Sequence, residues 1–187
     1  MFYAVRPTPR QLEACLDQSA RLQLSYAHVG IAQQSPSGFD VDQMSVSVAH
    51  GEEGFTRAKA ALAAWKHFSL GWVEIFPPGA STDPGTVVVV VVRHLGFWSL
   101  NGCRVVYGLG DRETHFGFAY GSLTNHAETG EEIFEVSWQR PSADVVYRVR
   151  AVSKPQSALA RLGYPFVRTL QARFRRDSAA AMRRALR

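Results

Sequence analysis

The stretch from Trp72 to Val152 most constrains the fold, because nearly all of it has the pattern of short β-strands separated by turn residues. Its strongest segment contains six consecutive valines, which are β-branched and favour strands over helices. Loops of hairpin length between the segments favour an antiparallel meander. We expect six strands, at Trp72–Phe76, Thr86–Arg93, Leu100–Leu109, His115–Gly121, Glu132–Trp138 and Asp144–Val152.

Helical and alternating patterns precede this meander. Thr8 and Gln11 form a capping-box pattern at the start of one helix, and Leu22–Ile31 then has a weak strand pattern. The alternation of apolar and polar residues over Phe39–Ala49 predicts a half-buried strand. Residues 52–68 follow with aromatic side chains at helical spacing, which predicts a helix with a heavy inner face.

The last segment, Pro155–Arg187, predicts a long helix interrupted at residues 163–165. Its apolar stripe consists of Phe166, Leu170, Phe174 and Met182. Residues 157–187 contain 8 Arg and one Asp, whereas the rest of the chain carries 13 Lys and Arg against 15 Asp and Glu. The net charge of +5 therefore belongs to this segment.

The length and composition are those of one globular domain. A chain of 187 residues is long enough for one core, so residues 1–187 are expected to form a single domain. The longest apolar runs are far shorter than the roughly 18 residues that would span a bilayer, and the N-terminus lacks a signal-peptide pattern. We therefore expect a cytoplasmic protein, with the isolated Cys15 and Cys103 buried as small apolar residues.

The order of these elements predicts the architecture. One strand, a helix, six antiparallel strands and a terminal helix make an α+β fold, in which the long helix covers the apolar face of the sheet. This order is similar to the helix-grip fold of START-type and Bet v 1-like proteins. The resemblance implies a curved antiparallel sheet of about six or seven strands, wrapped on the C-terminal helix with a cavity between them.

Four sequence motifs that together extend over most of the chain carry a second resemblance. They are WKHFSLGWVEIFPPG (65–79), RHLGFWSLNGCRVVY (93–107), FGFAYGSLTNHAETGEE (116–132) and SKPQSALARLGYPFVRTLQARFRRDSAAAMRRA (153–185). With these motifs the chain resembles the family called domain of unknown function number nineteen-ninety. That resemblance implies no particular activity.

The polar run after Tyr120 contains the candidate catalytic residues His126, Glu128 and Glu131. One histidine with nearby carboxylates can act as a general acid–base pair. The same residue types are common in an exposed hairpin end, and we expect this run to form the rim of a ligand cavity. No second histidine at ligand spacing is present, so we expect no metal site.

The strand before this run has two unlike faces. Phe116, Phe118 and Tyr120 share one face, while the small residues Gly117, Ala119 and Gly121 share the other. Small side chains permit close packing, and we expect the terminal helix to pack on them.

Aromatic and basic residues supply the candidate ligand contacts. Arg93 and Arg104 flank a turn between apolar strands, and an inward-pointing arginine would suit a ligand with an acidic group. Pairing with carboxylates on the surface explains these arginines equally well. The ligand-binding candidates are Trp65, Arg93, Trp98, Arg104, Tyr107, Phe118 and Tyr120.

Three functions remain open from the sequence. The first is binding of a small hydrophobic or amphipathic ligand between the sheet and the terminal helix. The second is a cofactor-independent lyase, cyclase or hydrolase that uses His126 with Glu128 or Glu131. The third is contact with an anionic surface through the arginine-rich helix, although a solvated helix face accounts for these arginines too. No nucleotide, cofactor or covalent-catalysis motif is present, and no aromatic residues interleave with the arginines as in nucleic-acid platforms.

Overall fold

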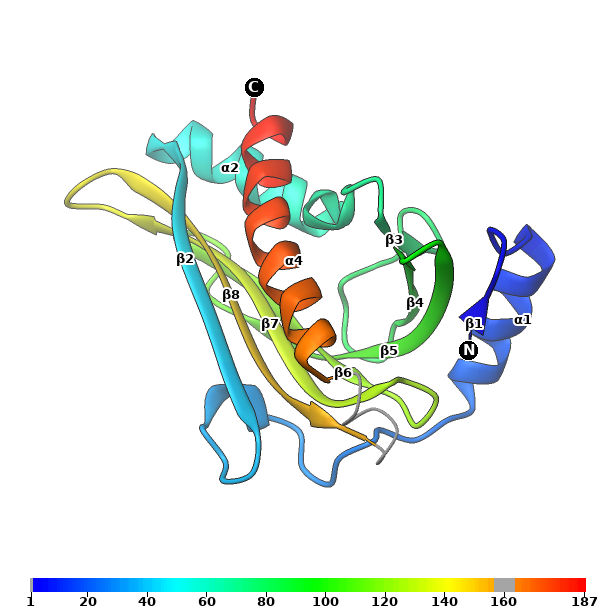
Figure 1. Ribbon diagram of the computed structural model, residues 1–187. Helices are drawn as coiled ribbons and strands as arrows, with labels where there is room; N and C mark the ends of the chain where they lie inside the picture. Colours follow the sequence, from blue (N-terminus) through cyan, green and yellow to red (C-terminus); the bar gives the residue numbers. More distant parts are fainter. Residues whose placement is uncertain (1, 157–163) are drawn as a thin grey trace.

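The computed structural model describes residues 2–156 and 164–187. A long, curved sheet surrounds the C-terminal helix, and a second helix crosses near one end of it (Figure 1). Along the chain the elements are β1 (Phe2–Tyr3), α1 (Pro9–Ala20), η1 (Ile31–Gln33), β2 (Asp40–His50), α2 (Gly51–Ala63), η2 (Lys66–Phe68), β3 (Val73–Phe76), β4 (Val87–His94), β5 (Phe97–Leu109), β6 (His115–Ser122), β7 (Glu128–Gln139), β8 (Asp144–Pro155) and α4 (Tyr164–Ala185).

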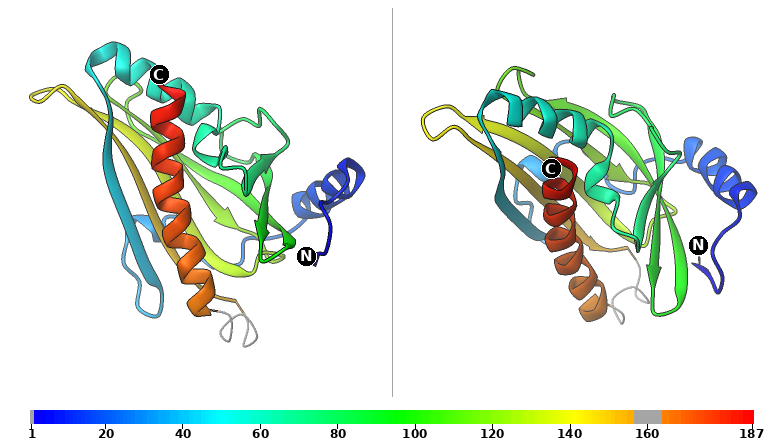
Figure 2. Two further views of the ribbon diagram at one scale, coloured as in Figure 1. Left: turned by 45° about the horizontal axis from the view of Figure 1, so that its top comes forward. Right: turned by 90° about the horizontal axis from the view of Figure 1, so that it is seen from above.

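The sheet has the strand order β2-β8-β7-β6-β5-β4-β3, and every neighbouring pair is antiparallel. This confirms the predicted meander from β3 to β8, with β2 closing the far edge beside β8. The short strand β1, which we did not expect, pairs with β5. Helix α4 lies within the curve of the sheet in two further views, which defines a concave face and an opposite, convex face (Figure 2). The predicted helix-grip architecture is confirmed.

An aromatic core fills the concave side between the sheet, α2 and α4. Phe118 and Phe134, on neighbouring strands, pack with ring centroids 5.7 Å apart, and Trp65 lies 4.7 Å from Phe118. Helix α4 contributes Phe174, which is 6.3 Å from Phe134, and the fully buried Met182. Burial of each large apolar side chain contributes about 1.5–3 kcal/mol, so this cluster is a main source of stability.

The terminal helix packs on the core through the predicted apolar stripe. Leu170 and Phe174 pack against the main core, and Met182 belongs to it. Helix α4 begins at Tyr164. The expected helical segment before the interruption falls mostly on residues 157–163, outside the described residues.

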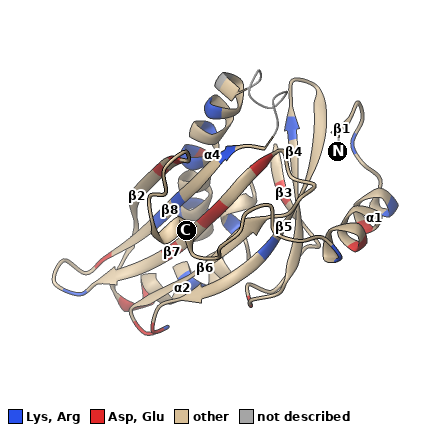
Figure 3. Cartoon of the chain, turned by 90° about the horizontal axis from the view of Figure 1, so that it is seen from below, with Lys and Arg blue, Asp and Glu red and all other residues tan. Residues whose placement is uncertain are grey.

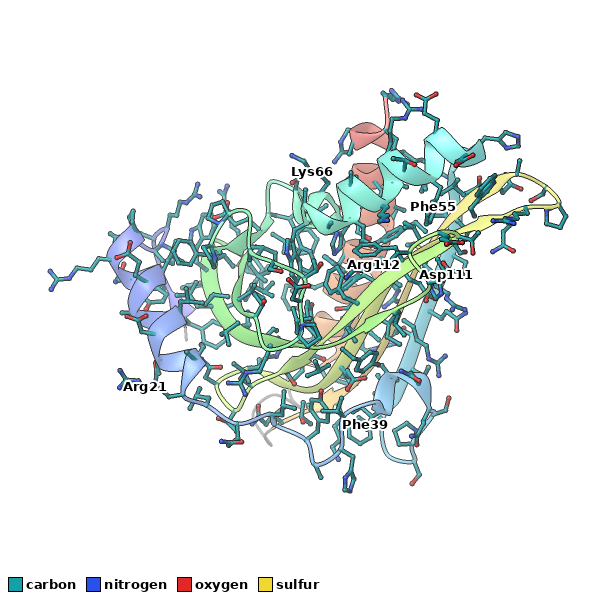
Figure 4. The ribbon with its side chains drawn as sticks, turned by 180° about the vertical axis from the view of Figure 1, so that it is seen from behind. Arg21, Phe39, Phe55, Lys66, Asp111 and Arg112 are labelled. Atoms are coloured by element: carbon teal, nitrogen blue, oxygen red, sulfur yellow. The ribbon has the colours of Figure 1, made fainter. Side chains whose placement is uncertain are left out.

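The convex face is covered by N-terminal segments instead of by α4. Helix α1 begins with the predicted capping box at Thr8, and its buried Cys15 packs with side chains of β4 and β5. Figure 4 shows α1, with Arg21 at its end, beside these strands. The predicted strand over residues 22–31 is wrong: it forms one isolated bridge, between Leu24 and Leu123. Cys103 is also buried and free, as expected.

The small face of β6 is covered by this irregular segment. A methyl group added at Gly121 would lie 2.1 Å from the Tyr26 hydroxyl oxygen, and Ala119 packs with Ala32 of η1. The expectation that α4 packs on the small residues is therefore wrong. The helix instead contacts the large side chains of the concave face, because the curved sheet leaves more room there.

Candidate ligand cavity

A cavity of about 790 Å³ lies on the concave side, between the sheet and α4. This volume lies within the range of small-molecule sites. One part of its wall is apolar, with side chains from η2, β3, β4 and α4. These residues are Phe68, Trp72, Val73, Val90, Val92, Phe166, Val167, Leu170 and Phe174.

The other part of the wall is polar and is built mainly by β6, β7 and α4. Glu128 at the start of β7 accepts a hydrogen bond of 2.8 Å from the Gln171 side-chain amide of α4. Glu132, four residues further along the same strand, accepts one of 2.9 Å from the Tyr120 hydroxyl of β6. Alternation along the strand directs both carboxylates, with Gly130 between them, to the concave face.

The two carboxyl groups titrate abnormally. Burial, together with the nearby charges of Glu128 and Asp42, raises the pKa of Glu132 to about 7, against the hydrogen bond from Tyr120 and the charge of Arg175. The pKa of Glu128 is also raised, mainly by burial, although hydrogen bonds from Gln171 and Ser153 oppose this. Each carboxylate thus has neutral hydrogen-bond donors in a poorly solvated position.

Two arginines, Arg175 in the cavity wall and Arg168 beside it, are already bound to another carboxylate. Asp42 of β2 accepts hydrogen bonds from both ends of the Arg168 guanidinium group. Its Oδ1 also lies 3.0 Å from Arg175 Nη2. Asp42 is buried, and both arginines come from α4, so this cluster fixes the helix to the edge strand.

His126 lies in the cavity wall, in the β6–β7 connection. Its Nδ1 accepts a hydrogen bond of 3.0 Å from the Glu128 backbone N–H, and burial lowers its pKa to about 4. The ring is therefore neutral at neutral pH and carries its proton on Nε2. Within the described residues it forms no ion pair with Glu128 or Glu131, so the expected orienting carboxylate is missing.

Glu131 adjoins the cavity wall, but its carboxylate is bound on the convex side. Its carboxylate accepts hydrogen bonds from Tyr26 Oη at 2.9 Å and Tyr107 Oη at 2.5 Å. The backbone N–H groups of Gly30 and Ala32 donate two more, at 2.9 and 3.2 Å. With four protein donors, Glu131 binds the irregular segment to the sheet and is not available to a ligand in the cavity.

Of the predicted ligand contacts, the aromatic residues of the concave face lie nearest the cavity. Tyr120 is part of its wall. Trp65 and Phe118 lie in the adjoining core, where Trp65 stacks on Tyr120 at 6.4 Å.

The other four predicted contacts lie outside the cavity wall. The Arg93 guanidinium lies 5.9 Å from the ring of Trp98, which packs with the α1 cluster on the convex side. Arg104 donates to the backbone oxygens of Ala20 and Leu22 at the end of α1. Tyr107 donates to Glu131 on the convex side. Because Arg93 and Arg104 both lie outside the cavity wall, neither anchors a group inside the cavity.

The sequence candidates did not include Asp42, Glu132, Gln171 and Arg175, which the structure brings to this site, although Glu132 belongs to the polar run after Tyr120. One signal was available for Glu132, because Tyr120 was placed on the same face as Phe118 and lies directly opposite Glu132 in the strand register. The other three come from β2 and α4, and their proximity depends on how the helix crosses the sheet.

Most arginines of α4 have partners within the protein. Arg173 and Arg176 pair with Asp177, and Arg183 donates to the backbone oxygen of Ser47. Arg168 and Arg175 bind Asp42, as described above. Figure 3 shows basic segments on α4 and β8 and acidic segments on the strands, and the ion pairs between them join Arg168 and Arg175 to Asp42 of β2 and Arg148 to Glu135 of β7. These contacts explain much of the arginine content without an external anionic surface.

The described residues contain neither a metal-binding cluster nor a helix that could cross a membrane. Within the described residues, no three His, Cys, Asp or Glu side chains come together in an arrangement that could hold a metal ion. No described helix is both long enough and apolar enough to cross a membrane.

The curved antiparallel sheet, the C-terminal helix within it and the cavity between them define a helix-grip protein. Solved structures of this kind are similar to the chain. A hypothetical protein from Helicobacter pylori matches with a TM-score of 0.54 and 11% identity, over 80% of this chain and 88% of that one. Norcoclaurine synthase from Thalictrum flavum matches with a TM-score of 0.52 and 11% identity, over 82% and 97%. At this identity the comparisons establish the fold alone.

The sequence itself identifies the family. The model of the family described as Domain of unknown function (DUF1990) matches residues 25–181, and the chain belongs to that family. A UPF0548 protein from Dictyostelium discoideum is 38% identical over 160 residues, covering 80% of this chain and 74% of the relative. A UPF0548 protein from Deinococcus radiodurans is 33% identical over 199 residues, covering 99% and 98%.

Proposed function

We propose that this protein binds a small amphipathic molecule in the cavity between the sheet and α4. The observation that carries the proposal is the cavity of about 790 Å³, apolar on one side and lined with carboxylates on the other. Such a division suits a ligand with an apolar body and a polar end, since each part meets a wall of matching character. The Bet v 1-like fold supports the proposal.

A substitution that fills the cavity tests this directly. Leu170 of α4 is part of the apolar wall, and Leu170→Trp would place a larger side chain in the ligand's space. We expect the affinity for the neutral, apolar fluorescent probe 1-N-phenylnaphthylamine to fall about tenfold or more, because the added ring removes contact area. Probe fluorescence in a titration measures the effect.

Ala172→Trp is the matched control, because Ala172 is exposed on the same helix and lies outside the cavity wall. It adds the same side chain without filling the cavity, so probe binding should be unchanged. Equal probe affinity of the natural protein, Leu170→Trp and Ala172→Trp would contradict the proposal. Native mass spectrometry of the protein from its own host, followed by denaturing analysis of what is released, would identify the natural ligand.

The same cavity supports a second candidate, cofactor-independent acid–base catalysis. It rests on Glu132, whose pKa of about 7 suits proton transfer near neutral pH and whose carboxylate accepts a hydrogen bond from Tyr120. Glu132 replaces His126 as the proposed base, because the lowered pKa makes His126 a weak base and its Nδ1 already accepts a hydrogen bond from the Glu128 backbone N–H. Turnover of any lyase, cyclase or hydrolase substrate that persists in Glu132→Gln would contradict this candidate.

A further inference from the structure

The polar wall of the cavity has an excess of negative charge. Its Glu128 and Glu132 carboxylates, together with Asp42 and the guanidinium groups of Arg168 and Arg175, form one group of charges at the contact of β7, β2 and α4. With all five side chains ionised, three carboxylates oppose two guanidinium groups. A single positive charge is needed to balance them.

Both guanidinium groups are already paired with a carboxylate. Arg168 and Arg175 bind Asp42, which is buried and lies between them. Glu128 and Glu132 accept hydrogen bonds only from neutral donors among the contacts that the structure describes: Gln171 and Ser153 for one, Tyr120 for the other. The unbalanced charge therefore belongs to the two glutamates that face the cavity.

The carboxylates of the polar wall also have acceptor capacity left for a ligand. In the described structure Glu132 accepts one side-chain hydrogen bond, from Tyr120, whereas a carboxylate can accept several. Unbalanced carboxylates with free acceptor positions favour a ligand group that donates hydrogen bonds and carries positive charge. An ammonium group has both properties, whereas a carboxylate or phosphate has neither.

We propose, resting on the ligand-binding function above, that the cavity takes an amphipathic amine whose ammonium group binds at the Glu128 and Glu132 carboxylates. The apolar part of the ligand lies against the wall formed by β4 and α4, near Val90, Val92 and Leu170. This reverses the charge that the sequence suggested for the ligand, because Arg93 and Arg104 lie outside the cavity wall.

Three probes with the same apolar chain separate this proposal from its alternatives: decylamine, decanol and decanoate. Each is titrated against the full chain, at concentrations below micelle formation, by displacement of 1-N-phenylnaphthylamine. At about pH 8 we expect decylammonium to bind about tenfold more tightly than decanol, with decanoate weakest, since a charge-assisted hydrogen bond contributes about that factor.

Glu128→Gln and Glu132→Gln are nearly isosteric and remove one negative charge each. Either change should reduce decylammonium affinity about tenfold and leave decanol affinity unchanged, and the unchanged decanol value shows that the cavity is intact. Glu13→Gln, on the exposed face of α1, is the control for a general loss of negative charge and should have no effect.

The preference for the amine should also depend on pH. Lowering the pH through about 7 adds a proton to Glu132, so decylammonium affinity should fall while decanol affinity stays constant. The amine itself stays protonated throughout this range. The titratable groups whose charges influence Glu132 or are influenced by it are Asp42, Cys103, Tyr120, Glu128, Tyr147 and Arg175.

The outcomes distinguish this inference from the proposed function. Decanol or decanoate binding as tightly as decylammonium would overturn the amine assignment and leave ligand binding in place. An amine preference that survives both Gln substitutions would also overturn it. Failure of all three probes, together with failure of 1-N-phenylnaphthylamine itself, would overturn both proposals.

Discussion

Two adjacent residues of β7, the buried Glu131 and the partly buried Glu132, meet opposite conditions on the two faces of one sheet. On the convex face, Glu131 accepts hydrogen bonds from two tyrosines and two backbone N–H groups. On the concave face, Glu132 accepts one, from Tyr120, and borders an open cavity. The first carboxylate has its donors within the protein, and the second has capacity left for a ligand.

The same contrast extends to other polar groups on the two faces. On the convex side, Arg150 donates to the backbone oxygens of Ala32 and Gln34 and to two side chains. Toward the concave side, His67 and His94 each have a buried ring nitrogen without a partner in the described structure. The convex face is thus built for stability, and the concave face retains polar groups that cost stability.

The largest effect should come from Glu131→Ala. Four donors would lose a buried, charged acceptor, so we expect the free energy of unfolding to fall by about 4 kcal/mol. Urea denaturation followed by circular dichroism measures the change. Ligand-probe affinity of the folded fraction should not change, because Glu131 does not offer its carboxylate to the cavity. A loss below about 1 kcal/mol would remove the contrast between the two faces.

Glu132→Gln should change the free energy of unfolding in the opposite direction and stabilise the protein. The raised pKa means that folded protein keeps this proton up to about pH 7, whereas the unfolded chain loses it near its ordinary value. The contribution of Glu132 to stability is therefore fully present at acid pH and is lost as the pH rises through about 7. Above that pH the variant should be more stable than the natural protein, by up to about 3 kcal/mol.

Unfolding curves at about pH 5 and about pH 8 test the sign. The stability gained by Glu132→Gln should be small at the lower pH and should grow toward the higher one. Glu13→Gln, whose side chain is exposed on α1, provides the baseline for removing a carboxylate. A gain independent of pH would show that titration of Glu132 is not its cause.

The sequence predicted the strands and helices better than the way in which they pack together. The valine run, the turn glycines and the alternation along the strands were enough to predict the meander and the helix that covers it. Alternation also separates Glu131 from Glu132, because neighbouring residues of a strand point to opposite faces. It does not tell which face is concave, since that depends on the direction in which the whole sheet curves.

Long-range contacts explain the predictions that failed. The segment around Tyr26 has little periodicity of its own, and its position depends on hydrogen bonds to Glu131, 105 residues away along the chain. Arg104 is similar: the sequence offered it as a ligand anchor, but its guanidinium group binds the end of α1. Such contacts join segments that are distant along the chain, and local patterns carry no information about them.

The smallest effect at neutral pH concerns His67, which also belongs to the concave side. Its side chain is fully buried among aromatic rings, 4.6 Å from Phe134 and 5.7 Å from Trp65, and neither ring nitrogen has a partner in the described structure. A buried N–H without an acceptor is destabilising. His67→Phe keeps the ring contacts and removes the polar atoms, although the larger ring offsets part of the gain. We expect an increase of about 1 kcal/mol near pH 7.

Acid pH should enlarge this difference. Burial lowers the pKa of His67 to about 3, so the folded protein keeps the ring neutral while the unfolded chain gains a proton below its ordinary pKa of 6.5. The stability of the natural protein should fall with pH across this window, and the His67→Phe variant lacks this contribution. The lowered pKa of His126 affects both proteins equally and cancels. The unfolding free energies of the natural protein and of His67→Phe are compared from about pH 7 to about pH 4. If their difference stays constant, His67 must have a polar partner, and the concave face would destabilise the fold less than its contacts indicate.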